Sequence, residues 1–168
     1  VASFIPEQSV YITSLSKSLA PGLQIGYASV PISVKSSISL ALTSLNVSVS
    51  PLMAELSARL IVSGQIDIII REHKDKTKER NELFNRYFPS NIYRGNENSI
   101  FRWLHLKGSI KGSYFEQAAL DKGVQVYAAE RFAVGNTAAE RAVRVAICAP
   151  ESIEELEAGL KILHDIMK

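Results

Sequence analysis

Two basic side chains, Lys17 and Arg144, stand where the sequence could support chemistry on a small molecule. Lys17 follows a run rich in β-forming residues, 9–16 (SVYITSLS), and precedes a Pro21-Gly22 pair that suits a type II turn. This pattern predicts a buried strand, a polar loop that carries the lysine, and a returning strand over 24–30. A lysine that condenses with an aldehyde must be partly unprotonated, which requires desolvation or nearby cations. The end of a buried strand facing a cleft would provide that setting, and a solvated loop lysine is the alternative.

Arg144 lies within a second predicted strand, 142–148 (AVRVAIC). Alternation places it on one face with small residues, while the other face carries Val143, Val145 and Ile147. A guanidinium beside small side chains can hold a carboxylate through two parallel hydrogen bonds. An arginine on the wet face of a half-exposed strand is the alternative interpretation.

The remaining candidates for chemistry are weaker. His73, His105 and His164 lack metal-ligand spacing, so we interpret all three as structural. Cys148 is the only cysteine, which excludes an internal disulfide, and we expect it to be a small buried apolar residue. Trp103, in a predicted strand over 100–106, is expected to belong to the core.

Composition narrows the class of protein. The formal charge of +2 is too small to indicate a nucleic-acid or membrane surface, and apolar and charged contents of 46% and 21% are ordinary for a globular domain. No stretch approaches the ~20 apolar residues of a membrane helix. The segment Val1–Pro6 lacks the basic leader of a signal peptide. With a single cysteine, these features lead us to expect a cytoplasmic protein that does not insert into membranes.

The elements that must position the two basic residues follow from periodicity and from Pro and Gly. A helix and a loop are expected within 32–50, and Pro51 suits the first turn of a helix that reaches Ile61. Ser63-Gly64 separates it from a longer helix over 65–87, whose charged middle is typical of a solvated face.

Residues 89–168 are predicted to form an α+β unit. Besides the strands over 100–106 and 142–148, a strand is expected over 124–127. Ser113 to Glu116 and Ser152 to Glu155 each match a capping box, the second of which starts the last helix.

The segment from Tyr11 to Tyr27 (YITSLSKSLAPGLQIGY) resembles the lysine region of fold-type I pyridoxal-phosphate-dependent aminotransferases. The resemblance extends to the branch that holds aminoadipate-type aminotransferases and MocR-type regulators of the GntR superfamily. It implies that Lys17 holds pyridoxal phosphate as a Schiff base and that Ser14 donates a hydrogen bond to the phosphate. Gln24 stands where the family has a phosphate-binding arginine, so it keeps a donor but loses the charge. Arg144 would grip the α-carboxylate of an amino acid.

The same resemblance implies an α/β fold that corresponds to the C-terminal portion of the aminotransferase fold. Residues 1–50 would be a remnant of the cofactor-binding large domain, 51–88 connecting helices, and 89–168 the small α+β domain. The groups that complete the cofactor site would precede the lysine, so the fragment alone is expected to lack transaminase activity.

Two functions remain open for the longer parent protein to which this segment would belong. The parent could be a MocR-type regulator that senses pyridoxal phosphate or an amino compound as a homodimer and binds DNA through an N-terminal winged-helix domain. It could instead be an amino acid aminotransferase, so whether the protein is an enzyme is left open. An α/β interaction module without a cofactor is a third class.

Overall fold

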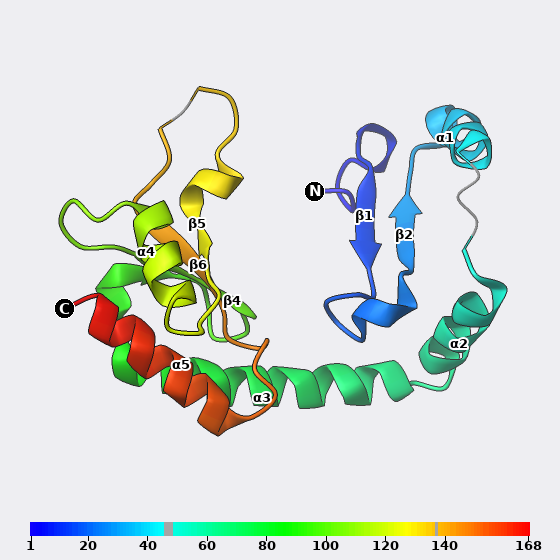
Figure 1. Ribbon diagram of the computed structural model, residues 1–168. Coiled ribbons are helices and arrows are strands. Elements are labelled where there is room, and N and C mark those ends of the chain that lie inside the picture. The colour runs from blue at the N-terminus through cyan, green and yellow to red at the C-terminus, as the bar shows by residue number, and fades with distance from the viewer. Residues whose placement is uncertain (46–48, 137) are drawn as a thin grey trace. The chain divides into compact units, whose positions relative to one another are not determined.

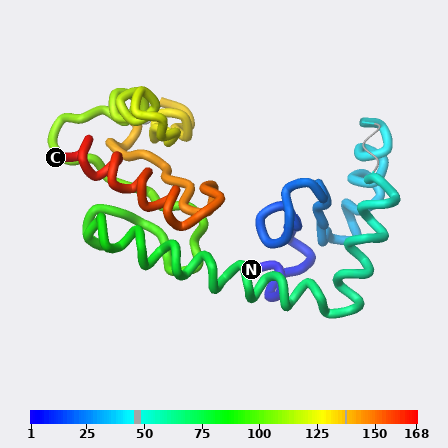
Figure 2. Tube along the Cα trace, turned by 60° about the horizontal axis from the view of Figure 1, so that its bottom comes forward, coloured from blue at the N-terminus to red at the C-terminus, as the bar shows by residue number. Residues whose placement is uncertain are grey.

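The structure, a computed structural model, describes residues 1–45, 49–136 and 138–168. The chain forms two compact units, Val1–His73 and Lys74–Lys168, which are described separately. Helix α3 (Gln65–Tyr87) contributes its first part to one unit and its remainder to the other, and it is continuous (Figure 2).

The first unit contains a β-hairpin and helices (Figure 1). Strands β1 (Tyr11–Ser14) and β2 (Gly26–Ser29) pair antiparallel, with Tyr11 opposite Ser29 and Ser14 opposite Gly26. The elements of this unit before α3 are η1 (Pro6–Gln8), β1 (Tyr11–Ser14), η2 (Pro21–Leu23), β2 (Gly26–Ser29), α1 (Ile32–Ser44) and α2 (Pro51–Val62). Part of the predicted segment 32–50, residues 46–48, lies outside the described residues.

The predicted burial of the strand before Lys17 is wrong. All four residues of β1 are exposed, as are those of β2, and both strands are shorter than the expected 9–16 and 24–30. A two-stranded ribbon has no neighbouring strand on either edge, and no helix layer covers β1 or β2 within the described part of the chain.

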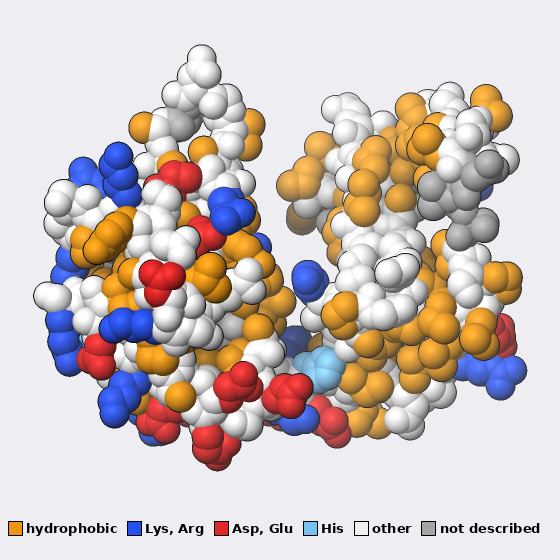
Figure 3. Space-filling model, in the orientation of Figure 1, with side chains coloured by type: hydrophobic (Ala, Val, Ile, Leu, Met, Phe, Trp, Pro, Cys, Tyr) orange, Lys and Arg blue, Asp and Glu red, His pale blue; other side chains and the backbone are white. Residues whose placement is uncertain are grey.

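Burial in this unit is concentrated beneath the turn that connects the two strands. Leu15, Leu23 and Ile25 form a small buried cluster, against which Met53 of α2 and Ile66 of α3 pack. Elsewhere the unit exposes many apolar side chains, which Figure 3 shows in orange. Three of the most exposed are Phe4 (87%), Ile32 (82%) and Val62 (88%).

The predicted boundaries of α2 and α3 are closely confirmed. Pro51 occupies the first turn of α2, where its missing amide hydrogen has no acceptor to lose. The helix ends at Val62, and Gly64 takes a left-handed backbone conformation with φ 73°, which a glycine adopts without a steric penalty. α3 then begins at Gln65 and ends at Tyr87, as the charge pattern predicts. None of the helices in the described ranges is long and apolar enough to cross a bilayer.

The second unit is built on a four-stranded antiparallel sheet with strand order β3-β4-β6-β5. Its helices α4 and α5 pack with the last part of α3 around one hydrophobic core (Figure 1). The elements are η3 (Ser90–Ile92), β3 (Tyr93–Arg94), β4 (Phe101–His105), α4 (Gly112–Leu120), β5 (Tyr127–Ala128), η4 (Ala129–Phe132), β6 (Ala142–Ala146) and α5 (Ile153–Ile166).

Alternating side chains divide this sheet into a buried face and an open face. The predicted alternation around Arg144 is confirmed, since Val143, Val145 and Ile147 are buried, whereas Arg144 is half-buried. The buried face packs against aromatic side chains of α3 and α4 and against leucines of α5. The fully buried residues of this core include Phe84, Phe88, Phe115, Leu104 and Leu160.

Of the two predicted capping boxes, the serine cap of the second is present, while the Glu155 carboxylate accepts from the Glu151 amide. The Ser152 hydroxyl accepts a hydrogen bond from the Glu155 amide at 3.1 Å, and this bond starts α5. The box predicted at Ser113 is wrong, because α4 already begins at Gly112, and the Glu116 carboxylate accepts a hydrogen bond from the Ala128 amide instead.

Candidate functional site

Lys17 lies in a tight turn directly after β1, and its side chain is exposed. The turn is closed by backbone hydrogen bonds from the amides of Leu19 and Ala20 to the carbonyl oxygen of Leu15, at 2.8 and 3.2 Å. A further bond from the Leu15 amide to the Ile25 carbonyl oxygen, at 3.0 Å, extends the hairpin past its last paired strand residues. The lysine is therefore presented from a turn whose backbone is fixed on both sides.

Two interactions hold this turn against the rest of its unit. Leu15 and Leu23 are buried in the small apolar cluster, so the residues before and after the lysine anchor the loop. His73 of α3 lies 3.2 Å from the carbonyl oxygen of Ser18, which neighbours Lys17. A carbonyl oxygen only accepts, so Nδ1 of His73 must carry the hydrogen in this contact.

The structure brings Ser14 and Gln24 to the same end of the hairpin as Lys17. Ser14 closes β1 opposite Gly26, and Gln24 lies two residues before Gly26; the side chains of both are exposed. Within the first unit, an amine, a hydroxyl and a carboxamide thus come from one short hairpin end.

The expected type II turn at Pro21-Gly22 is wrong. Pro21–Leu23 forms a 3-10 helix, and the left-handed residue is Gln24, with φ 50°. Leu23 is buried in the cluster, so the chain reverses only after it, and the reversal falls on Gln24. An L-residue in this conformation costs roughly 1–2 kcal/mol.

Arg144 belongs to the second unit and lies on the open face of the sheet. In the strand register it is opposite Trp103 of β4 and Tyr127 of β5. Its guanidinium carbon is 4.5 Å from the ring centroid of Phe101, 5.2 Å from that of Tyr127 and 4.8 Å from that of Phe132. Sequence reasoning missed these aromatic neighbours, because they come from three separate elements and depend on strand register.

The Arg144 Nε atom is buried and has no hydrogen-bond partner among residues 1–45, 49–136 and 138–168. A buried N–H without a partner costs about 1–3 kcal/mol, which a bound oxygen atom would recover. Arg102 makes an instructive contrast, since it is also buried but on the face covered by helices, over the rings of Tyr93 and Phe84. Burial lowers the pKa of Arg102. Of the two arginines, only Arg144 is on a face that a ligand could approach.

The loop that follows Arg144's strand is held by α3. Arg80 donates hydrogen bonds to three carbonyl oxygens: Ile147 at 3.1 Å, Pro150 at 2.8 Å and Glu151 at 3.3 Å. Cys148, in the same loop, is exposed, so the expectation that it is buried is wrong. The strand ends at Ala146, and Cys148 therefore lies beyond the part of the sheet that the core covers.

Trp103 is also placed differently from the expectation. It is half-buried on the open face, and its indole nitrogen donates to the Glu140 carboxylate at 2.9 Å. Arg94 and His105 lie 3.5 and 3.9 Å from the same carboxylate. The indole hydrogen bond, and then these two basic groups, lower the pKa of Glu140.

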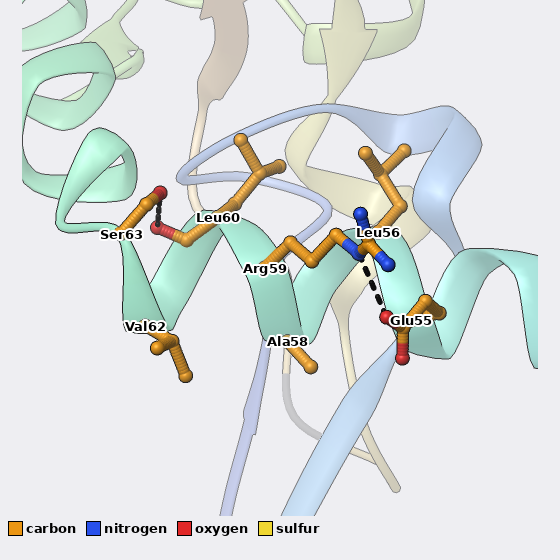
Figure 4. Close-up of a pocket in the computed structure, with 7 residues that line it drawn as sticks. All are labelled: Glu55, Leu56, Ala58, Arg59, Leu60, Val62 and Ser63. Atoms are coloured by element: carbon orange, nitrogen blue, oxygen red, sulfur yellow. Dashed lines mark hydrogen bonds and ion pairs between the residues drawn. The ribbon is translucent and has the colours of Figure 1, made fainter.

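Neither a metal-binding cluster nor the hollow along α2 provides a second candidate site in the described residues. Within the described parts of the chain, no group of three or more His, Cys, Asp or Glu residues could hold a metal ion. A hollow of about 540 Å³ runs along α2, where Arg59 pairs with Glu55 at 2.7 Å (Figure 4). Within the described ranges, the residues that line it come from α2 and the residue directly after it, so it is the surface of one helix, and polar groups from other described elements do not converge on it.

Nearly the whole chain is similar in sequence to part of a bacterial regulator. No protein-family model matches the chain. The HTH-type transcriptional regulator YdeF of Bacillus subtilis (strain 168) is 54% identical over 167 residues, which are 99% of this chain. The chain spans about a third (36%) of the length of that regulator.

Several solved structures share the fold. The alpha-aminoadipate aminotransferase of Thermus thermophilus has a TM-score of 0.81 at 19% identity, with 99% of this chain and 43% of that chain covered. The kynurenine aminotransferase of Pyrococcus horikoshii has a TM-score of 0.80 at 19% identity, over 96% and 41%. The valine-pyruvate aminotransferase of Salmonella typhimurium LT2 has a TM-score of 0.80 at 18% identity, over 94% and 43%.

These findings confirm the predicted fold class and the resemblance that the lysine segment indicates. The chain has the fold of the C-terminal portion of a pyridoxal-phosphate-dependent aminotransferase, and its sequence resembles the corresponding part of an HTH-type transcriptional regulator.

Proposed function

We propose that the chain is the aminotransferase-like effector domain of a MocR-type transcriptional regulator, and that it binds pyridoxal phosphate or an amino compound through Lys17. The observation that carries the proposal is the 54% identity to an HTH-type regulator across nearly the whole chain. In this proposal residues 1–50 belong to the cofactor-binding large domain, 51–88 connect, and 89–168 form the small domain.

The donors at the end of the hairpin fit such a cofactor. Lys17 would hold its aldehyde carbon, and Ser14 would donate to a phosphate oxygen in a charge-assisted hydrogen bond. Gln24 would add an uncharged donor where the family has an arginine, so the phosphate would be held less tightly. When bound, pyridoxal phosphate acts as an electron sink for the amino compound that it carries.

Arg144 would hold the carboxylate of the amino compound. The carboxylate fits the guanidinium because Nε is a buried donor without a partner in the described residues, and two parallel N–H bonds suit a planar anion. The rings of Phe101 and Phe132 lie against the guanidinium and fix its orientation before a ligand arrives.

The complete protein would bind DNA through a winged-helix domain outside these 168 residues, and it would act as a homodimer. The HTH-type relative supports the DNA-binding part of this proposal. The exposed apolar side chains of the first unit are compatible with further protein surface covering them.

The test uses the complete gene product. Pyridoxal phosphate is added, the visible absorption band of a lysine-bound cofactor is recorded, and borohydride reduction is followed by peptide mapping. We expect the label at Lys17 and its loss in Lys17→Ala, while Lys35→Ala, which removes an exposed lysine of α1, keeps it. A label at another lysine would reject the assignment.

An amino acid aminotransferase is the second candidate, and the three solved aminotransferases of this fold favour it. The two candidates differ in what the complete protein does with an amino acid and a 2-oxo acid. Amino transfer between them, without binding to DNA upstream of the protein's own gene, would support the enzyme. Binding to that DNA that changes when the amino compound is added would support the regulator.

A further inference from the structure

The open face of the sheet in the second unit carries more aromatic side chains than are needed to hold one arginine. Trp103 and Arg144 are direct partners in the antiparallel register, so their side chains leave the sheet on the same side. Phe132 packs edge-on against Trp103, with ring centroids 5.6 Å apart, and also lies 4.8 Å from the guanidinium carbon. Phe132 is therefore shared by the arginine and by the surface beside it.

A cavity of about 380 Å³ lies next to these rings. Trp103, Phe132 and Glu140 line it, and the other lining residues in the described part of the chain are alanine or valine. Ligand pockets in proteins measure roughly 300–1,000 Å³, so this cavity is large enough for an amino acid side chain. Phe132 both lines this cavity and lies against the Arg144 guanidinium, so the side chain of a ligand whose carboxylate is held at Arg144 could reach the apolar space.

One charged group limits what the cavity accepts. Glu140 is a lining residue, and its carboxylate is fixed by the indole N–H of Trp103 at 2.9 Å. Its lowered pKa keeps it ionised at neutral pH. Arg94 already lies 3.5 Å from it, so a second carboxylate in the cavity would meet an anion whose neighbouring guanidinium is already engaged.

We propose that this cavity selects the amino compound: amino acids with aromatic or branched aliphatic side chains bind, dicarboxylic amino acids are rejected, and Phe132 is the residue that sets this preference. The inference rests on the proposed function, because it requires the ligand carboxylate to be held at Arg144. It goes further by naming the class of side chain.

The experiment measures the binding of L-phenylalanine, L-leucine and L-glutamate to the complete protein, loaded with pyridoxal phosphate, by titration calorimetry. We expect phenylalanine and leucine to bind at least tenfold more tightly than glutamate, a ratio of about the size that an apolar pocket provides. Phe132→Ala should abolish the preference, and Glu140→Gln should strengthen the binding of glutamate. Tyr114→Ala, which removes an exposed aromatic ring from α4, should leave all three affinities unchanged.

The outcomes distinguish a failure of the side-chain preference from a failure of the carboxylate site. If Arg144→Gln abolishes binding of all three amino acids but glutamate binds the wild type as tightly as phenylalanine, the side-chain inference fails and the proposed function stands. An unchanged preference in Phe132→Ala would also overturn the inference. If no amino acid binds, or if binding does not depend on Arg144, the proposed carboxylate site fails, and the inference fails with it.

Discussion

Asn81 offers the sharpest test of how α3 holds the strand that carries part of the Arg144 site. Its side chain is 1% exposed, and its amide nitrogen donates to three carbonyl oxygens: Thr77 at 2.9 Å, Glu97 at 2.8 Å and Ser99 at 3.0 Å. Glu97 and Ser99 belong to the segment before β4, the strand that contains Phe101. The substitution Asn81→Asp preserves the shape of the side chain and removes both donor hydrogens.

The expected cost has two parts. The two hydrogens of the Asn81 amide are shared among the three oxygens, and losing both donors costs about 2 kcal/mol, at about 1 kcal/mol per hydrogen. The introduced carboxyl group would also face three carbonyl oxygens in a buried site, and burial raises carboxyl pKa values by up to about 3–5 units. At about 1.36 kcal/mol per unit, an upward shift of about 3 units adds ~4 kcal/mol at pH 7.

The second part depends on pH, and its sign follows from the raised pKa. Below the unfolded pKa of about 4 the introduced group is protonated in both states, and its O–H can donate to one of the three carbonyl oxygens, so a loss of only ~1 kcal/mol remains. As the pH rises toward the folded pKa, the loss grows to about 6 kcal/mol. Asn81→Asp should therefore be far less destabilising at pH 4 than at pH 7, when each is compared with the wild type at the same pH.

Urea unfolding followed by fluorescence measures this directly, because Trp103 is the only tryptophan and lies in the same unit. Asn85→Asp is a matched control on the next turn of α3, where the exposed side chain accepts a hydrogen bond from the Tyr93 hydroxyl through Oδ1. That acceptor is retained, so little change is expected. A loss below about 1 kcal/mol for Asn81→Asp at pH 7, or one that does not shrink at pH 4, would refute the reasoning.

Two further substitutions test charged side chains of the second unit. Glu116→Gln should cost about 1–2 kcal/mol, because the carboxylate accepts bonds from Arg131 at 2.6 Å and from the Ala128 amide at 2.7 Å. Arg131 is the main cause of the lowered pKa of Glu116, so this contribution is present above the unfolded pKa and fades as the pH falls through the folded one; denaturant midpoints at pH 7 and pH 3 should differ accordingly. Arg102→Met should change stability by less than about 1 kcal/mol, because the lost cation–π contact is offset by the removal of a buried Nε that has no partner in the described residues. Arg102→Ala should lose about 3 kcal/mol, because it leaves a cavity. A larger loss for methionine than for alanine in thermal unfolding would contradict this.

The local features of the fold could be predicted from the sequence because their causes are local. The bounds of α3 follow from Gly64 and from the charge pattern after it, and the hydroxyl of Ser152 caps α5 from three residues away. The Ser113 capping box failed for the opposite reason. The carboxylate that would complete it is engaged by Ala128 and Arg131, which lie 12 and 15 residues further along the chain.

In the candidate site, too, features with local causes could be predicted and features that depend on distant residues could not. The position of Lys17 after a strand and the face of Arg144 within its strand follow from the pattern of neighbouring residues. The aromatic rings around Arg144 do not, because strand pairing and the η4 turn bring Phe101, Tyr127 and Phe132 together from distant parts of the chain. The exposure of β1 likewise depends on which neighbours cover it, and a strand's own composition does not specify them.

The grip of Arg80 on the loop after β6 has a consequence for how this protein can vary. Its three acceptors are backbone carbonyl oxygens, and every residue type supplies one. Mutations that change the side chains at 148, 149 or 151 leave those acceptors in place, so this loop can drift over evolutionary time while its path is preserved. All three of these contacts come from position 80, where lysine would offer one point charge in place of a planar fork.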